Sequence, residues 1–269
     1  MSPARLPARI TIMGAGSSGG VPVAGLGWGR CDPGNPLNRR SRPSILVDVA
    51  ERRFLIDTSP DLRNQLLAAG VTHLDGVIYT HGHADHLHGI DDLRGINRAM
   101  NAPIPAYMDQ STLTHVENSF AYVLAPLPER ANGYYFKPAL QPHLIIPGQP
   151  FDAAGVRFET FDQDHGFSRT VGFRVGNFGY STDLVRLPEH GFDVLAGIHT
   201  WIIGVFTDGE HRTHVNVNTA LAWIERVKPA RAILTHLGPD LDYENLCRTL
   251  PAHVEPAYDG MTVEVPPFD

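Results

Sequence analysis

Histidine and aspartate side chains are concentrated in one short stretch, Tyr79-Thr80-His81-Gly82-His83-Ala84-Asp85-His86. The stretch follows an apolar segment at 77–80 that is typical of a buried strand. His81 and His83 can converge on one ion from an extended loop, and Asp85 and His86 can turn to a second ion nearby. The spacing therefore predicts a site for two metal ions where a strand ends. A His-rich polar loop without a metal is the alternative.

Two ions need more than four ligands, and three further candidates each follow a predicted strand. They are His165, Asp183 and His236. The last repeats the local order of the first motif, because Leu-Thr-His at 234–236 parallels Tyr-Thr-His at 79–81. Each of the three, taken alone, is more often a structural residue. Together and in this order, they complete a site for two ions.

The composition describes an ordinary globular chain of 269 residues, with 42% apolar and 19% charged residues and a net charge of −7. The acidic balance argues against nucleic acid or an anionic membrane as a partner. Two cysteines, Cys31 and Cys247, cannot form the disulfide framework of a secreted protein. The apolar run at 10–13 is too short for a signal peptide, and no run reaches transmembrane length. We therefore expect a cytoplasmic protein.

A glycine-rich loop at 14–20 follows the first predicted strand, at 9–13, and reads Gly-x-Gly-x-x-Gly. This is the dinucleotide fingerprint, which works only when a helix begins at the third glycine. Gly20, Pro22 and further glycines up to Gly29 exclude that helix. A loop of exposed amides near the metal site remains, and it could contact an anion.

The other predicted elements alternate between strands and helices, which favours a mixed α/β class. Strands are expected at 44–49, 53–56, 156–161, 171–175, 178–182, 200–206 and 230–235. One helix is expected from Ser59, its N-cap, to a point before Gly70, one from 91–94, and one from Val217 to a point before Pro229. No linker divides the chain, so a single domain over 1–269 is expected.

Residues 101–150, rich in proline and aromatics, are expected to form an irregular insertion that is either a lip over the active site or the contact of a homodimer. A basic run, Arg39-Arg40-Ser41-Arg42, is either a structural cluster or a phosphate site. For residues 101–150 the sequence does not decide between the lip and the dimer contact. For the basic run at 39–42 it favours the structural cluster.

The order His-x-His-x-Asp-His, then single His, Asp and His residues, resembles the metallo-β-lactamase superfamily over nearly the whole chain. Three segments resemble its PhnP-type branch, the cyclic-phosphate phosphodiesterases of phosphonate metabolism. They are Gly-x-Gly-x-x-Gly-Gly-Val-Pro near the start, Asp-His-Leu-His-Gly-Ile-Asp-Asp-Leu-Arg at 85–94 and Tyr-Asp-Gly-Met at 258–261. The resemblance implies a four-layer αβ/βα sandwich of two pseudo-symmetric halves, with the metals at one edge.

The resemblance also implies which residues bind which ion. The first ion is expected at His81, His83 and His165, the second at Asp85, His86 and His236, and Asp183 is expected to bridge them. Imidazoles and carboxylates without a thiolate suit zinc or manganese. Asp57 is either a carboxylate that supports the histidine loop or a solvated turn residue.

A phosphodiesterase mechanism follows from the same resemblance. A water shared between two ions loses a proton near neutral pH, and the hydroxide attacks phosphorus. His214 matches a PhnP-type histidine near the leaving group and is expected to be the general acid, with Asp85 as the second catalytic residue. The alternative for His214 is a capping or surface histidine before a helix. The expected substrate is a small cyclic phosphodiester or a nucleotide-like molecule.

Other functions share this ligand set. A tRNA 3′-processing endonuclease is disfavoured by the acidic charge and the lack of a long basic insertion, and a glyoxalase II-type thioesterase stays open. A metal-bound scaffold that binds nucleotides without turnover is the non-enzyme alternative, which the complete ligand set disfavours. Two positions depart from the PhnP pattern: Cys31 stands alone where that branch has a cysteine cluster, and Gly204 stands where it often has an acidic residue. The first departure predicts no third metal. Both weaken the inference that this chain acts on the same substrate as that branch.

Overall fold

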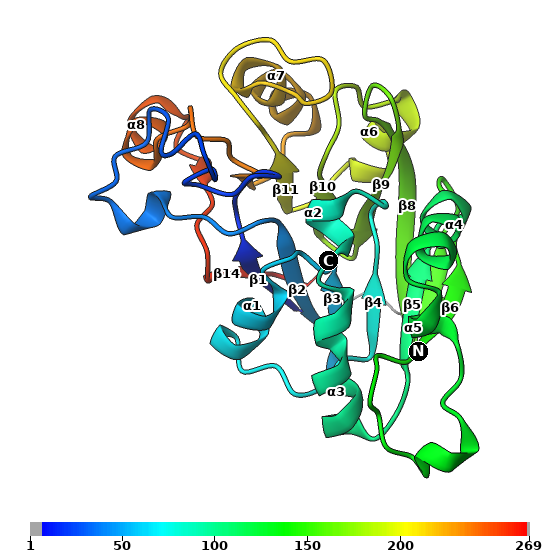
Figure 1. Ribbon diagram of the computed structural model, residues 1–269. Helices are drawn as coiled ribbons and strands as arrows, with labels where there is room; N and C mark the ends of the chain where they lie inside the picture. Colours follow the sequence, from blue (N-terminus) through cyan, green and yellow to red (C-terminus); the bar gives the residue numbers. More distant parts are fainter. Residues whose placement is uncertain (1–6, 268–269) are drawn as a thin grey trace.

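Two seven-stranded β-sheets make up the centre of the molecule (Figure 1). The computed structural model describes residues 7–267. The first sheet has the order β14 (Met261–Val265), β1 (Ala8–Gly14), β2 (Ser44–Val49), β3 (Arg52–Ile56), β4 (Gly76–Ile78), β5 (Ile104–Met108) and β6 (Leu140–Leu144). The second has the order β13 (Val254–Pro256), β12 (Arg231–Thr235), β11 (Thr200–Gly204), β10 (Phe178–Ser181), β9 (Arg169–Val175), β8 (Val156–Asp164) and β7 (Phe151–Ala153).

The sheets pack face to face because alternate residues of each strand point to opposite sides. In β2, Ile45 and Val47 join a core that includes Phe173 and Ile202 of the second sheet. Leu46, between them, points the other way and packs with the helices of the first half. One strand therefore contributes to two cores.

Helices cover the outer face of each sheet. Those over the first sheet are α1 (Leu62–Ala68), α3 (Leu93–Met100), α4 (Gln110–Ser119) and α5 (Ala121–Leu124). Those over the second are α6 (Glu189–Leu195), α7 (Val217–Val227) and α8 (Tyr243–Thr249). The order helix, sheet, sheet, helix confirms the predicted four-layer sandwich.

Parallel pairing brings the candidate ligands to one edge. Strands β3 to β6 are parallel to one another, and so are β10 to β13. The loops after β4, β10 and β12 therefore leave the sheets at their carboxyl ends, where open α/β sheets place their sites. The short helix α2 (Ala84–Leu87) belongs to the first of these loops.

Two sequence-based expectations are wrong. Helix α1 begins at Leu62 instead of directly after Ser59, because Ser59 caps a preceding turn by accepting the N–H of Asp61. Residues 101–150 are not an irregular insertion, since they contain β5, α4, α5 and β6. Their prolines suggested breaks, but Pro105 lies within β5, and Asp109 starts α4 by accepting the N–H of Thr112 at 2.9 Å.

The basic run at 39–42 is a structural cluster, as the sequence favoured. Arg40 is buried and donates to the carbonyl of Leu241 at 2.8 Å. Arg42 forms a bidentate ion pair with Asp61, and the guanidinium of Arg39 lies over the ring of Trp28. Across residues 7–267 no helix has the length and apolar character needed to cross a membrane.

Candidate metal centre

The seven predicted ligands meet at the edge where the two sheets face each other. His81 and His83 lie in the loop after β4, and Asp85 and His86 lie in α2. The other three come from the second half: His165 from the turn between β8 and β9, Asp183 after β10, and His236 after β12. Each half places its candidate ligands at or just after strand ends.

These residues form two groups, each able to hold a metal ion. The first comprises His81, His83, His165 and Asp183, and the second comprises Asp85, His86, Asp183 and His236. Within each group the ligand atoms lie within 4.8 Å of one another. Asp183 belongs to both groups, which is the arrangement expected for a bridging carboxylate.

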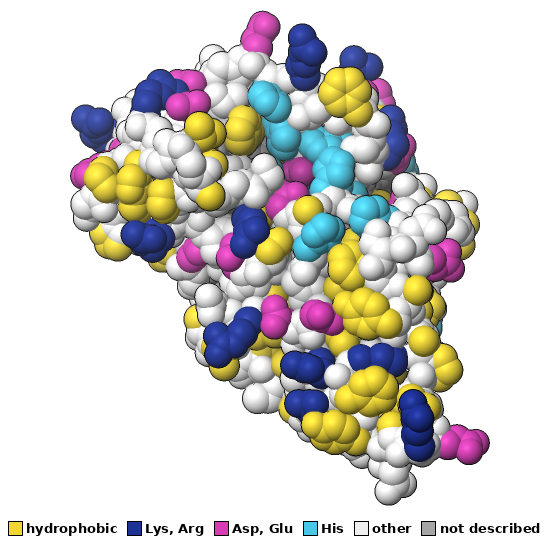
Figure 2. Space-filling model, in the orientation of Figure 1, with side chains coloured by type: hydrophobic (Ala, Val, Ile, Leu, Met, Phe, Trp, Pro, Cys, Tyr) yellow, Lys and Arg dark blue, Asp and Glu magenta, His cyan; other side chains and the backbone are white. Residues whose placement is uncertain are grey.

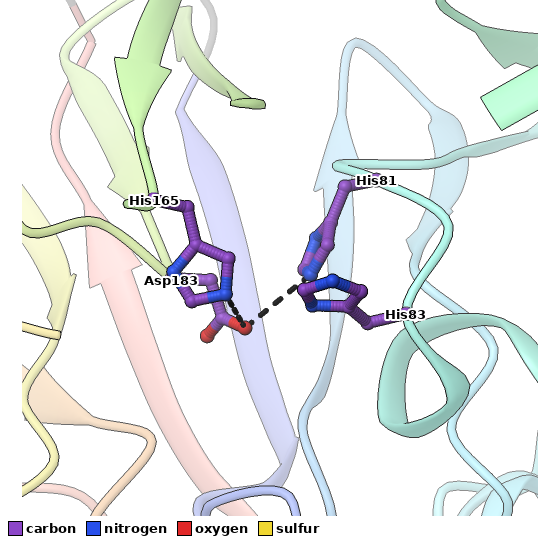
Figure 3. A group of neighbouring side chains, drawn as sticks. All are labelled: His81, His83, His165 and Asp183. Atoms are coloured by element: carbon purple, nitrogen blue, oxygen red, sulfur yellow. Dashed lines mark ion pairs between the residues drawn. The ribbon is translucent and has the colours of Figure 1, made fainter. Parts of the chain in front are cut away.

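Asp183 lies at the middle of the site. Figure 3 shows His81, His83 and His165 pointing toward one another and toward its carboxylate. Its Oδ2 is 3.3 Å from His81 Nε2 and 3.5 Å from His165 Nε2. In the second group, its Oδ1 is 2.9 Å from His236 Nε2 and its Oδ2 is 3.4 Å from His86 Nε2.

Buried imidazole nitrogens of the site are available to bind a cation. The Nε2 atoms of His81 and His86 are buried and lack a hydrogen-bond partner within the part of the chain that the structure describes. A buried polar atom left unpaired costs about 1–3 kcal/mol, and a bound ion would remove that cost. Imidazole and carboxylate donors suit zinc and manganese, so the residues present fit the expected divalent ions.

Asp57 fixes the orientation of the histidine loop. It is fully buried, its Oδ2 is 2.6 Å from His86 Nδ1, and its Oδ1 accepts the N–H of Thr80 at 2.8 Å. The hydroxyl of Thr80 donates to Asp57 and lies 2.9 Å from His81 Nδ1. Both histidines thus use Nδ1 for support and present Nε2 to the site. Asp57 is therefore the supporting carboxylate and not a solvated turn residue.

The backbone orients His165 in the same way, with Nδ1 used for support and Nε2 facing the site. Its Nδ1 lies 2.7 Å from the carbonyl oxygen of Thr213, which can only accept, so Nδ1 carries the proton and Nε2 is free for a metal.

Burial and neighbouring charges shift the pKa values of the site's side chains in different directions. Burial raises the pKa of Asp183, but His236 and His86 outweigh burial and hold that pKa well below its usual range. Burial lowers the pKa of His236, but Asp183 and Asp85 raise it to about 9. For His81, His83 and His165, burial is the main cause of a lowered pKa. The carboxylates are ionised and these three imidazoles are neutral, which is the state that binds metals.

His214 lies beside both groups of ligands. Its Nε2 is 3.8 Å from Asp183 Oδ1, and its ring stacks on His236 with centroids 5.2 Å apart. Burial and the neighbouring His236 lower its pKa to about 3. It does not cap the following helix, because Asn216 fills that position and accepts the N–H of Thr219.

Sequence reasoning missed one neighbour of His214. The Nδ1 of His211 is 3.2 Å from His214 Nδ1. Both rings also pack on Phe206. The three-residue spacing of the two histidines in a loop gave no signal, since only the loop conformation brings them together.

A cavity of about 280 Å³ opens onto the ligands. Ser18, from the glycine-rich loop, and Phe167 and Ser168, from the β8–β9 turn, line it together with His214. The glycine-rich loop is therefore close to the site, as predicted. Figure 2 shows histidines gathered on this face around acidic side chains.

Comparisons with known proteins agree with this geometry. The family described as "Beta-lactamase superfamily domain" matches residues 52–237. The crystal structure of a diphosphatase from the PhnP family superposes with a TM-score of 0.85 at 30% identity, covering 97% of this chain and 99% of that chain.

Two curated relatives carry different names. An octanoyltransferase of Porphyromonas gingivalis is 32% identical over 94% of this chain, but the chain spans only 51% of that protein's length. A ribonuclease Z of Mycobacterium bovis is 26% identical, covering 86% of each chain. With the family match extending over more than half of its length, the chain belongs to the metallo-β-lactamase superfamily of hydrolases and lies on its PhnP-like branch.

Proposed function

We propose that this protein is a metal-dependent phosphoesterase that hydrolyses a small phosphodiester or diphosphate, such as a cyclic phosphodiester or a nucleotide-like molecule. The observation that carries the proposal is the pair of ligand groups sharing Asp183. The similarity to a PhnP-family diphosphatase supports phosphorus as the reacting centre.

The first ion would be held by His81, His83 and His165, the second by Asp85, His86 and His236, and Asp183 would bind both. Two divalent ions at such a site lower the pKa of a water molecule and offset the charge of a phosphate. Zinc or manganese suits these donors.

The chain's own groups then orient the substrate and handle the proton. His214 Nε2 points into the cavity near Asp183, where it can donate a proton to the departing oxygen. Burial and the neighbouring His236 lower its pKa, and a phosphate anion bound alongside would favour the protonated form that donates. Asp85 is ionised, since His86 and His236 outweigh burial and lower its pKa, and its charge holds His236 in place.

Ribonuclease Z activity is the second candidate, because the similarity to the M. bovis enzyme extends over most of both chains. The net charge of −7 argues against a polynucleotide, whose affinity depends on basic side chains. The octanoyltransferase name carries less weight, because the chain spans half of that protein and the name does not say which half is active.

The proposal is tested by incubating zinc- or manganese-loaded protein with four substrates: a nucleoside 2′,3′-cyclic phosphate, a nucleoside diphosphate ester, a tRNA precursor and an acyl thioester. We expect turnover of one of the first two. Turnover of the tRNA precursor or the thioester alone would contradict the proposal. Asp183→Ala serves as the control for contaminating activity.

A further inference from the structure

The segment that carries Asp183 separates from β9 just before it reaches the metal centre. Strands β9 and β10 lie side by side (Figure 1), and their main-chain pairing runs from Val175 with Phe178 to Phe173 with Tyr180. Asp183 lies beyond that point and has φ of 49°, in the left-handed region that a non-glycine residue occupies only where its surroundings hold it. On its β9 side, another contact must therefore hold the backbone at Asp183.

Two buried side chains supply that contact. Gln163 of β8 and Thr170 of β9 are paired across the two strands, and both are buried. The hydroxyl of Thr170 donates to the carbonyl oxygen of Asp183 at 2.9 Å. Gln163 Nε2 donates to Thr170 Oγ1 at 2.9 Å and to the carbonyl oxygen of Thr182 at 3.0 Å. The two side chains therefore hold the carbonyl groups of Thr182 and Asp183.

The amide of Gln163 has one orientation. A carbonyl oxygen only accepts, so the amide nitrogen must face the carbonyl of Thr182. The amide oxygen, Oε1, is buried and lacks a hydrogen-bond partner within residues 7–267. Gly172 leaves room for this amide, because a Cβ there would lie 2.8 Å from Oε1 and 2.2 Å from the ring of Phe161. An unpaired buried oxygen is destabilising, so the contribution of Gln163 lies in the bonds of its nitrogen.

Strand β9 also contacts the other half of the metal centre. The N–H of Val171, the residue after Thr170, donates to the carbonyl oxygen of Thr80 at 2.9 Å. Thr80 directly precedes His81. Two neighbouring residues of one strand thus hold the backbone beside His81 and at Asp183, whose Nε2 and Oδ2 atoms are 3.3 Å apart.

We propose that Gln163 and Thr170 are positioning residues of the metal centre, which hold the backbone of Asp183 so that its carboxylate reaches both groups of ligands. The inference rests on the metal-dependent function proposed above and concerns the ions rather than the substrate. Without the two side chains, the backbone at Asp183 can relax out of its left-handed conformation, and the carboxylate then moves away from one or both ions. Removing a group that orients a metal ligand lowers metal affinity about 10–100-fold.

The test compares substitutions at two buried threonines. Thr170→Val removes the hydroxyl and keeps the shape of the side chain, whereas Thr170→Ser keeps the hydroxyl. Thr160→Val is the matched control, because Thr160 of β8 is equally buried and its hydroxyl donates at 2.8 Å to the carbonyl oxygen of Gln149, in the loop before β7. Competition with a chromogenic chelator measures the zinc dissociation constants, and urea unfolding of the metal-free protein measures stability.

We expect Thr170→Val to weaken the binding of at least one zinc ion about tenfold or more, and Thr170→Ser to stay within about threefold of wild type. Thr160→Val should lower the urea midpoint as Thr170→Val does and leave both dissociation constants unchanged. Gln163→Met, which removes the amide with little change in size, should weaken zinc binding in the same way. It provides a second variant if Thr170→Val does not fold.

The outcomes distinguish the two proposals. If wild-type protein binds no zinc, the metal-dependent function is wrong and the positioning role is overturned with it. If wild type binds zinc and the folded Thr170→Val or Gln163→Met variant binds it as tightly, the function stands and the positioning role alone is overturned. The positioning role is also overturned if Thr160→Val or Thr170→Ser loses as much zinc affinity as Thr170→Val, because the loss then does not depend on the Thr170 hydroxyl.

Discussion

The two halves of the chain hold their shares of the metal centre by different means. In the first half, four ligands lie within residues 81–86, and the side chains of Asp57 and Thr80 orient two of them. In the second half, each of three ligands ends a separate segment, and His165 is oriented by a backbone carbonyl. Two of the three, Asp183 and His236, have left-handed backbone conformations with φ of 49° and 57°. The first half relies on a local side-chain network, and the second relies on the position of its strands.

This difference has a physical consequence. A side-chain network can be removed by one substitution, whereas a carbonyl and a strand register cannot. Non-glycine residues in the left-handed region cost on the order of 1 kcal/mol or more each, and they persist only where the surrounding structure holds them. The second half therefore holds strained backbone at residues that would contact the metals, whereas the first half holds it at Asp57, which has φ of 63° and orients His86 without being a candidate ligand.

The largest expected effect comes from the residue that the two groups of ligands share. Asp183→Ala removes a donor from both groups and leaves His236 and His81 without the carboxylate between them. We expect a loss of about a thousandfold or more in kcat for phosphoester hydrolysis. Steady-state kinetics with a nitrophenyl phosphodiester measures it, and retention of more than a tenth of the activity would contradict the bridging role.

Asp57→Ala tests the side-chain network of the first half. The substitution leaves a buried imidazole and a buried amide without their acceptor, so we expect a loss of about 3 kcal/mol in the free energy of unfolding. Metal affinity should fall about 10–100-fold, because His86 loses its orientation. Urea unfolding and metal titration measure the two effects. The matched control near the second-half ligands is Asp162→Asn, which removes an exposed ion pair with Arg169. It should change the free energy of unfolding by less than about 1 kcal/mol.

His214→Ala separates proton transfer from metal binding. With an alkoxide leaving group we expect kcat to fall about 100-fold, because the departing oxygen then lacks a proton donor. With p-nitrophenolate, which needs no proton, the fall should be smaller than about tenfold. Equal losses on the two substrates would remove the general-acid assignment, and metal content should be the same as in wild type.

The metal-free protein should lose stability as the pH rises. The pKa of His236 is raised to about 9, so its stabilising contribution is complete below the unfolded value near 6.5 and disappears as the pH rises through 9. The pKa of His86 is raised as well, which adds to the same trend. Urea unfolding of chelator-treated protein should show a decrease on the order of 3 kcal/mol between pH 6.5 and 9. A His236→Gln variant should show a shallower decrease, and an identical slope would contradict the pairing with Asp183.

Residue types and strand-end positions were enough to predict all seven candidate ligands, because both are local properties of the sequence. The sandwich itself came from the resemblance to a family. The left-handed conformations of Asp183 and His236 could not be predicted, since Asp and His are only enriched in that region and most of them lie outside it. The place of α4 beside Gly82 and the approach of His211 to His214 also escaped prediction, because both depend on contacts between segments far apart or on loop conformation.

The most direct test of the centre is the number of metal ions that the protein binds. Purified protein loaded with zinc or manganese, freed of excess metal by gel filtration and analysed by inductively coupled plasma mass spectrometry, should contain two ions per chain. In Asp183→Ala that number should fall to one or fewer. A wild-type protein that saturates at one ion, or an Asp183→Ala variant that keeps two, would contradict a centre built on a shared carboxylate.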